Sequence, residues 1–289
     1  MLGWLRSQSI EVEPMKKTSF VLFSGIAAMA LAGCQSAEES SENIETVLQD
    51  SHDTMSETTS YQMDTKAGSA QNDQGLETTT KLVREPFTYS SVQTMSNPET
   101  DETQETMMFI QDGQYYEQDP MLEEWITVPT EEAGMDDPAA IQPAEDQLEV
   151  LANHADSLSM EETDEHYQIT ASGTSEEATE LVLAFMNQNP EELDIELNEF
   201  SYEMLIEKDS MLQESSQLSI DGELVEQGQP FSEEVAYEFS QFNALEEADV
   251  DESAMEEAIS LEEAQEQMAD MQAEMEQEME QQQEMEQQD

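Results

Sequence analysis

The sequence predicts an α+β domain whose antiparallel strands are covered by two or three helices, followed by an acidic low-complexity C-terminal tail. Three patterns indicate this class. From residue 200 to 206 large side chains alternate with mostly polar ones, as in a strand with one buried face. Over 141–158 apolar residues recur at spacings of three and four, as on one face of a helix. Asp112-Gly113 separates two strand-like runs and is typical of a tight antiparallel hairpin.

The first half of the domain is predicted to be one helix followed by strands. Apolar residues from Ile44 to Met55 keep helical spacing, and Ser41 is expected to cap this helix. After the helix the period changes to two, in runs rich in Thr, Tyr, Phe and Val. The predicted strands cover 61–67, 76–84, 87–95, 106–111, 114–116 and 125–128.

The second half is predicted to mix helices and strands. Thr174 and Glu177 have the spacing of a capping box before an amphipathic stripe. Asp221-Gly222 predicts a second hairpin. The expected elements are a loop with three prolines over 129–143, helices over 141–158 and 178–185, and strands over 167–171, 200–206, 218–220 and 235–239.

The N-terminal segment has the features of a lipoprotein signal peptide. Lys16-Lys17 is followed by an apolar run over 20–32, which is too short for the ~20 residues that a membrane-spanning helix needs. The run ends in Leu31-Ala32-Gly33-Cys34, which resembles the bacterial lipobox, where the cysteine is lipidated and becomes the new N-terminus. The alternative is a chance cysteine behind an apolar run.

Lipidation at Cys34 would anchor the chain to the extracytoplasmic face of the bacterial cell membrane, with signal cleavage between Gly33 and Cys34. Two acyl chains, such as palmitate, on one glyceryl-cysteine suffice for stable anchoring. Translation is expected to begin at Met15. The expected division is a signal peptide over 1–33, a lipidated tether over 34–40, the α+β domain over 41–245 and the tail over 246–289.

The charge balance is strongly acidic, with 70 Asp and Glu against 7 Lys and Arg and a formal net charge of −63. This excludes a nucleic-acid binder, because phosphate recognition needs a basic surface. We interpret the acidity as adaptation to a saline habitat, of halophilic type, or to an alkaline one. A sponge for Ca²⁺ is the alternative, but no loop with calcium-ligand spacing occurs in the sequence.

The tail beyond residue 245 is rich in Glu, Gln and Met. Its last 25 residues contain nine Gln, seven Glu and five Met, and several of the methionines keep helical spacing. Like charges one helical turn apart disfavour an isolated helix. The tail is therefore expected to be a fluctuating helix or disordered.

Catalytic, metal-binding and cofactor motifs are missing from the sequence. Cys34 is the only cysteine, and His52, His154 and His166 each stand alone. A zinc site needs three or four converging ligands, and no nucleophile or phosphate-binding motif occurs. We therefore predict no enzyme, no metal site and no cofactor; Cu(I) on the methionines is the weaker alternative. Lys208 is expected to pair with neighbouring carboxylates.

The order of these elements resembles an uncharacterised lipoprotein family from Gram-positive (Bacillus-type) bacteria. Its expected fold is similar to that of the lipoprotein carrier LolA and the mycobacterial lipid carriers LppX and LprG. The resemblance implies a strongly curved antiparallel sheet, a half-open barrel whose concave face is covered by helices and can hold acyl chains. The matching motifs are Tyr61-Gln62-Met63, Gly113-Gln114-Tyr115-Tyr116 with Trp125, Tyr167-Gln168-Ile169 and Tyr202 to Asp209.

Two functions follow as hypotheses. In the first, the lipoprotein binds an apolar or lipid-like ligand in the half-barrel. In the second, it is an interaction or maintenance lipoprotein of the cell envelope with a filled core, no small ligand and a protein partner. The candidate ligand-lining residues of the first hypothesis are Phe200, Tyr202, Met204, Ile206, Tyr237 and Phe239.

Overall fold

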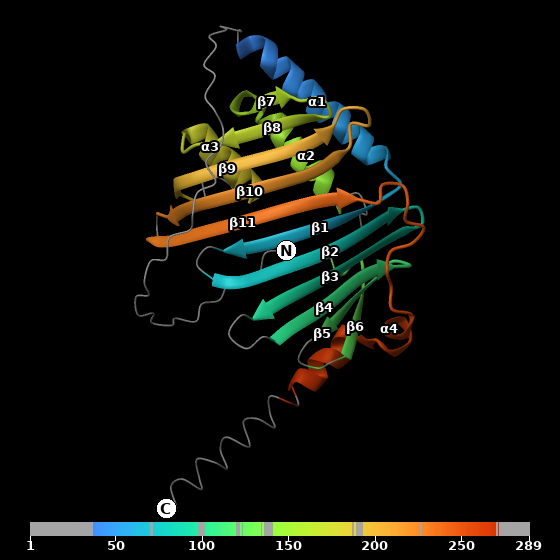
Figure 1. The fold of residues 1–289 in the computed structure, drawn as a ribbon. Coiled ribbons are helices and arrows are strands. Elements are labelled where there is room, and N and C mark those ends of the chain that lie inside the picture. The colour runs from blue at the N-terminus through green and yellow to red at the C-terminus, as the bar shows by residue number, and fades with distance from the viewer. Residues whose placement is uncertain are drawn as a thin grey trace, which may run out of the picture. The chain divides into compact units, whose positions relative to one another are not determined.

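The computed structural model describes most of the chain between residues 37 and 271, all within the unit Ser36–Asp289 (Figure 1). The signal peptide and lipobox expected before residue 35, and most of the expected tail, lie outside the described residues. Gaps in the description fall at 70–71, 98–101, 120–121, 123, 134, 136–140, 187, 189–192, 226 and 270.

The described strands form a single twelve-stranded sheet with the order β12-β6-β5-β4-β3-β2-β1-β11-β10-β9-β8-β7. Every neighbouring pair is antiparallel except β12 and β6. The order starts and ends on different strands, so the sheet is unclosed, and this confirms the predicted fold class. The strands are β1 (Ser60–Ser69), β2 (Asn72–Arg84), β3 (Phe87–Asn97), β4 (Glu102–Gln111), β5 (Gln114–Asp119), β6 (Glu124–Pro129), β7 (Ser159–Glu162), β8 (His166–Ser172), β9 (Ile195–Glu207), β10 (Gln213–Leu224), β11 (Gln229–Ser240) and β12 (Ile259–Ser260).

The sheet consists of two antiparallel meanders, β1 to β6 and β7 to β11, which are joined where β1 pairs with β11. In this seam Thr65 lies opposite Tyr237 and Met63 lies opposite Phe239. Strands from the two halves of the sequence therefore meet at the middle of the sheet.

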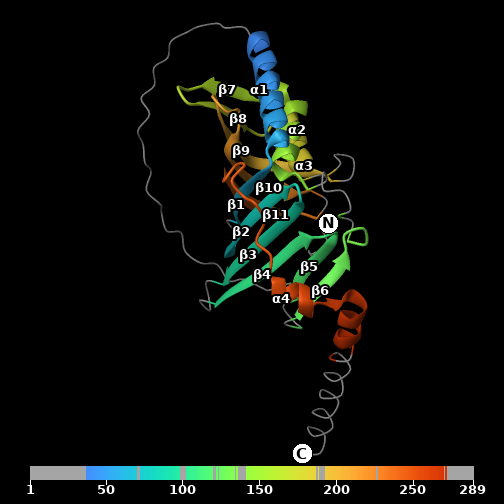
Figure 2. The ribbon, with the colours of Figure 1, turned by 90° about the vertical axis from the view of Figure 1, so that its right-hand side faces the viewer.

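One face of the sheet, here called the helix face, carries a continuous apolar surface. The cross-strand register places Tyr61 opposite Leu82, and Tyr202 opposite Leu218. Side chains alternate between the two faces along a strand. The two residues of a cross-strand pair therefore point to the same face, together with every second residue of each strand. Helices α1 (Ala37–Glu57), α2 (Pro143–Asn153) and α3 (Glu176–Phe185) lie together on one side of the sheet (Figure 2).

The main core lies between these helices and the helix face. Each helix buries one apolar stripe, as its periodicity predicts. A short 3₁₀ helix, η2 (Ala155–Ser157), follows α2. The buried stripes include Ile44, Leu48 and Met55 of α1, Leu148 and Leu151 of α2, and Leu181 and Val182 of α3.

The segment 241–260, here called the C-terminal strap, packs along the first meander. Its backbone donates hydrogen bonds from Asn243 to the carbonyl of Ser60 (2.8 Å) and from Ala248 to Thr88 Oγ1 (3.1 Å). In α4 (Glu252–Glu257), Ala254 packs with the Phe109 and Tyr116 rings. β12 then pairs with β6, and 261–269 is helical. Packed chain therefore extends beyond residue 245, where the domain was expected to end.

The strap covers the face of the sheet opposite to the helices. Tyr89 lies opposite both Leu82 and Ile110 in the register, so Ile110 shares the helix face. Phe109 is the next residue along β4, and its side chain must point the other way. Its ring stacks on Tyr116 with centroids 4.6 Å apart and forms a second, smaller core beneath the strap.

The Asp112-Gly113 hairpin is confirmed: both residues have positive φ angles, 52° and 75°, and join β4 to β5. The predicted capping residue of α3 is wrong by one position. Ser175, not Thr174, is the N-cap, and its hydroxyl accepts a hydrogen bond from the Ala178 backbone at 3.3 Å. β7, which lacks a clear alternation, was not predicted.

The predicted hairpin at Asp221-Gly222 is also wrong, because both residues lie inside β10. The chain turns later, where Gly228 has a φ of 59°. Gly222 is required by close packing: a Cβ there would lie 2.8 Å from the Glu196 carbonyl oxygen and 2.9 Å from the Phe231 ring. A glycine within a strand can indicate close packing of a neighbouring chain segment as well as a turn.

Candidate functional site

The six residues predicted to line a ligand cavity all lie on the helix face. Five of them are buried and Tyr237 is partly buried, and all belong to the main core or pack against it. Two of them also line surface pockets. Phe200 borders a pocket of about 280 Å³ beside the start of α3, and Tyr202 borders one of about 390 Å³ over β8 to β10. Met204, Ile206, Tyr237 and Phe239 line neither of these pockets.

A larger cleft, of about 420 Å³, lies between α2 and α3. We refer to it as the α2–α3 cleft. Its lining comes from α2 and α3 alone, whereas the pocket at Phe200 is lined by both α3 and the sheet. Its lining is Asp146, Gln147, Glu149, Val150 and Asn153 of α2, with Ala184 and Phe185 of α3.

Phe185 both lines the α2–α3 cleft and packs against the main core. Its ring stacks on the ring of Tyr202, with centroids 4.9 Å apart and an interplanar angle of 25°. Tyr202 belongs to β9 and is buried on the helix face. Phe185 therefore connects the cleft lining to Tyr202, one of the predicted lining residues. The sequence indicated only that Phe185 belongs to an apolar helical stripe.

A buried polar cluster adjoins the cleft at Gln147. The side-chain oxygen of Gln147 accepts hydrogen bonds from Ser216 Oγ at 2.8 Å and from Gln213 Nε2 at 3.1 Å. Two polar groups near Gln147 are buried without a hydrogen-bond partner of normal geometry among the described residues. They are the side-chain oxygen of Gln213 and the hydroxyl of Tyr202. Burial raises the pKa of Tyr202, and the Ser216 hydroxyl lowers it in part. Unpaired polar groups of this kind are costly inside a protein.

The rim of the cleft is acidic. Asp146 and Glu149 lie at its mouth on neighbouring positions of α2. Partial burial is the main reason why the pKa of Asp146 is raised, and the negative charges of Glu145 and Glu149 raise it further, while His52 opposes them. The rim therefore has a negative electrostatic potential that disfavours the binding of an anion.

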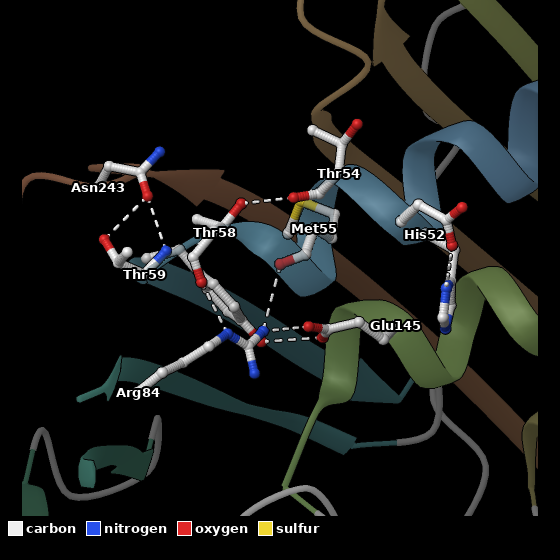
Figure 3. Close-up of polar contacts among 10 residues, drawn as sticks. His52, Thr54, Met55, Thr58, Thr59, Arg84, Glu145 and Asn243 are labelled. Atoms are coloured by element: carbon white, nitrogen blue, oxygen red, sulfur yellow. Dashed lines mark hydrogen bonds and ion pairs between the residues drawn. The ribbon is translucent and has the colours of Figure 1, made fainter. Parts of the chain in front are cut away.

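One end of the helix layer is fixed by Arg84, the last residue of β2 (Figure 3). Its Nε donates to the carbonyl of Thr58 at 2.7 Å, and its Nη2 donates to the carbonyl of Met55 at 3.3 Å. The same guanidinium forms an ion pair with Glu145 in the first turn of α2, whose side chain is only 2% exposed. This contact holds the end of α1, the end of β2 and the start of α2 together.

Tyr61 completes this cluster from β1. Its hydroxyl donates to Glu145 Oε2 at 3.5 Å, and its ring centroid lies 6.0 Å from the Arg84 guanidinium carbon. Burial is the main cause that raises the pKa of Tyr61, and the charge of Glu145 adds to it. Tyr61 therefore stays a neutral donor. On the strap side, the Asn243 side chain accepts from the Thr59 backbone at 2.7 Å (Figure 3).

The four Lys and Arg residues after Cys34 all have carboxylate partners. Lys66 lies 4.0 Å from Glu77, and Lys208 lies 2.5 Å from Glu162, which confirms the pairing expected for Lys208. Lys81 pairs with Asp249 of the strap, and Arg84 pairs with Glu145. These four are the only Lys and Arg in the part of the chain that the structure describes.

Within the described ranges, no three His, Cys, Asp or Glu side chains come together in a way that could hold a metal ion. No helix in the same part of the chain is both long enough and apolar enough to cross a bilayer.

Comparison with solved structures finds distant neighbours. The Mycobacterium tuberculosis lipoprotein LppX is 12% identical, with a TM-score of 0.41, over 73% of this chain and 99% of LppX. LprF from Mycobacterium bovis is 12% identical, with a TM-score of 0.39, over 71% of this chain and 95% of LprF. An uncharacterized conserved protein from Thermus thermophilus is 10% identical, with a TM-score of 0.33, over 75% and 99% of the two chains.

Comparison with curated proteins gave no significant match. A family model matches residues 35–259, from the position after Cys34 to β12. The match thus includes both meanders, the three helices and the C-terminal strap, and it confirms the prediction of an uncharacterised family. The chain belongs to this family of unknown function, DUF6612.

Proposed function

We propose that this chain is a lipoprotein of the extracytoplasmic membrane face that binds an apolar or lipid-like ligand between its helix layer and its sheet. The observation that carries the proposal is the stacking of Phe185, in the wall of the α2–α3 cleft, on Tyr202 of the helix face. A ligand chain that displaces this one ring gains access to a continuous apolar surface. The cleft volume of about 420 Å³ lies within the range of roughly 300–1,000 Å³ typical of ligand pockets. The proposed role is binding, with no reaction.

The anchor part of the proposal rests on the lipobox residues Leu31-Ala32-Gly33-Cys34. In the full chain expressed in a bacterium with lipoprotein processing, we expect a metabolically incorporated fatty acid label and recovery in the membrane fraction. Cys34→Ser removes the acceptor thiol, so both the label and the membrane association should be lost. Gly68→Ser, a substitution at a strand position with open space around it, is the control and should keep both. Label that persists in Cys34→Ser would contradict the anchor.

The ligand part is tested by native mass spectrometry of the chain from Ser36 to Asp289, paired with organic extraction. We expect a bound species of acyl-lipid mass. Ala184→Trp should lower its occupancy at least about fivefold, because the larger ring fills the cleft between α2 and α3. Glu180→Trp, one turn earlier on α3 and outside the cleft lining, is the matched control and should retain the ligand.

The second candidate is an envelope-interaction or maintenance lipoprotein with a filled core. The packing of Met204 and Ile206, both fully buried under the helices, favours it. In this case the same measurement would give a clean apo mass with no uptake of added lipid. The search would then turn to protein partners in the cell envelope.

A further inference from the structure

We infer that the α2–α3 cleft selects amphiphiles with an uncharged or cationic headgroup and discriminates against fatty acids and anionic phospholipids. The inference rests on the proposed function, since it names the class of ligand that the same cleft would take. Two features of the described residues support it: the position and pairing of the Lys and Arg side chains, and the charge of the cleft rim.

No Lys or Arg side chain of the described residues lines the cleft, so an anionic headgroup there has no such counter-charge beside it. Proteins that bind phosphate or carboxylate groups normally use Arg or Lys donors. Here Lys66, Lys81, Arg84 and Lys208 are each paired with a carboxylate, and none of them lines the cleft. An anion that recruited Arg84 would have to separate it from Glu145 and leave that carboxylate buried without its partner.

Acidic groups surround the place where a headgroup would lie. Asp146 and Glu149 both line the cleft and are both exposed. Exposed charges act over about 8 Å at physiological ionic strength, so these two carboxylates act on a headgroup bound beside them. A cationic headgroup is attracted by this rim, an uncharged one is not repelled, and an anionic one is repelled.

The test compares three probes with the same twelve-carbon chain: monolaurin, dodecyltrimethylammonium and dodecanoate. Each is titrated calorimetrically, below its micelle-forming concentration, into the chain from Ser36 to Asp289. We expect the first two to bind and dodecanoate to bind at least about tenfold more weakly at 0.15 M salt. The gap should narrow at 1 M salt, where the Debye length falls from about 8 Å to about 3 Å.

Two double variants distinguish the effect of the cleft rim on binding from the effect of the overall negative charge of the chain. Asp146→Asn with Glu149→Gln should narrow the gap between monolaurin and dodecanoate at least about threefold at 0.15 M salt. Glu176→Gln with Glu180→Gln removes the same charge from exposed positions of α3 outside the cleft lining, and should leave the gap unchanged.

The outcomes distinguish the inference from the function on which it rests. Dodecanoate binding as tightly as monolaurin would overturn the headgroup preference while leaving ligand binding in place. An equal effect of the two double variants would overturn the assignment to the α2–α3 cleft. Failure of all three probes to bind would contradict the proposed ligand-binding function itself.

Discussion

Arg84→Met is expected to lower the free energy of unfolding by about 3–5 kcal/mol, the range for removal of one partner from a buried ion pair. The substitution leaves Glu145, which is 2% exposed, buried without its counter-charge. It also removes donors from the carbonyls of Met55 and Thr58 at the end of α1. Urea unfolding at constant high salt would measure the loss.

Two further variants distinguish the loss of this buried ion pair from the loss of a positive charge in general. Lys66→Met breaks an ion pair whose two side chains are both exposed, so its effect should stay within about 1 kcal/mol. Combining Arg84→Met with Glu145→Leu removes both buried charges and should recover much of the loss. If the double variant were no more stable than Arg84→Met, an unpaired Glu145 carboxylate could not be the cause.

Met204→Ala is expected to lower the free energy of unfolding by about 2–5 kcal/mol, as for truncation of a large core residue. Met204 has 0% exposure and is surrounded by the main core, so the removed atoms leave a cavity. The reference is Met95→Ala, at a position 49% exposed on β3, which should change stability by no more than about 0.5 kcal/mol. Thermal or urea unfolding of both variants in high salt measures the difference.

The Met204 result also distinguishes two states of the core. A residue that lines open space already lacks packing partners, so its truncation forms little new cavity. A loss below about 1 kcal/mol in the ligand-free chain would therefore contradict the packed core seen under α2 and α3. A full loss in that chain, together with lipid uptake, would mean that the ligand separates the helices from the sheet when it binds.

Local patterns were sufficient to predict most of the elements. Alternation over 200–206 predicted β9, and the Asp112-Gly113 dipeptide predicted the β4–β5 hairpin, because both signals arise within a few residues of chain. Asp221-Gly222 carries the same local signal as the confirmed hairpin, yet it lies inside β10. The difference is the Phe231 ring, which packs where a side chain at 222 would stand. Such a contact depends on the neighbouring strand.

The candidate site was less accessible to sequence reasoning. The six predicted lining residues lie together on the helix face, because the side chains on one face of a strand follow from its period of two. The cleft itself depends on how two helices sit beside each other, and Gln147 and Phe185 carry no special signal in their own segments. The Arg84–Glu145 pair joins residues far apart in the chain, so the charge pattern along the sequence could not reveal it.

The seam between β1 and β11 has a consequence for the order in which the molecule can assemble. Synthesis starts at the N-terminus, so β1 is made long before the strand that will lie beside it. Until Thr65 can meet Tyr237, the first meander keeps an open edge of unpaired backbone groups, which invites association with other chains. Pairings so distant in sequence slow folding because a long loop must close first. The nascent protein is therefore prone to association with other chains until β11, its last long strand, has been synthesised.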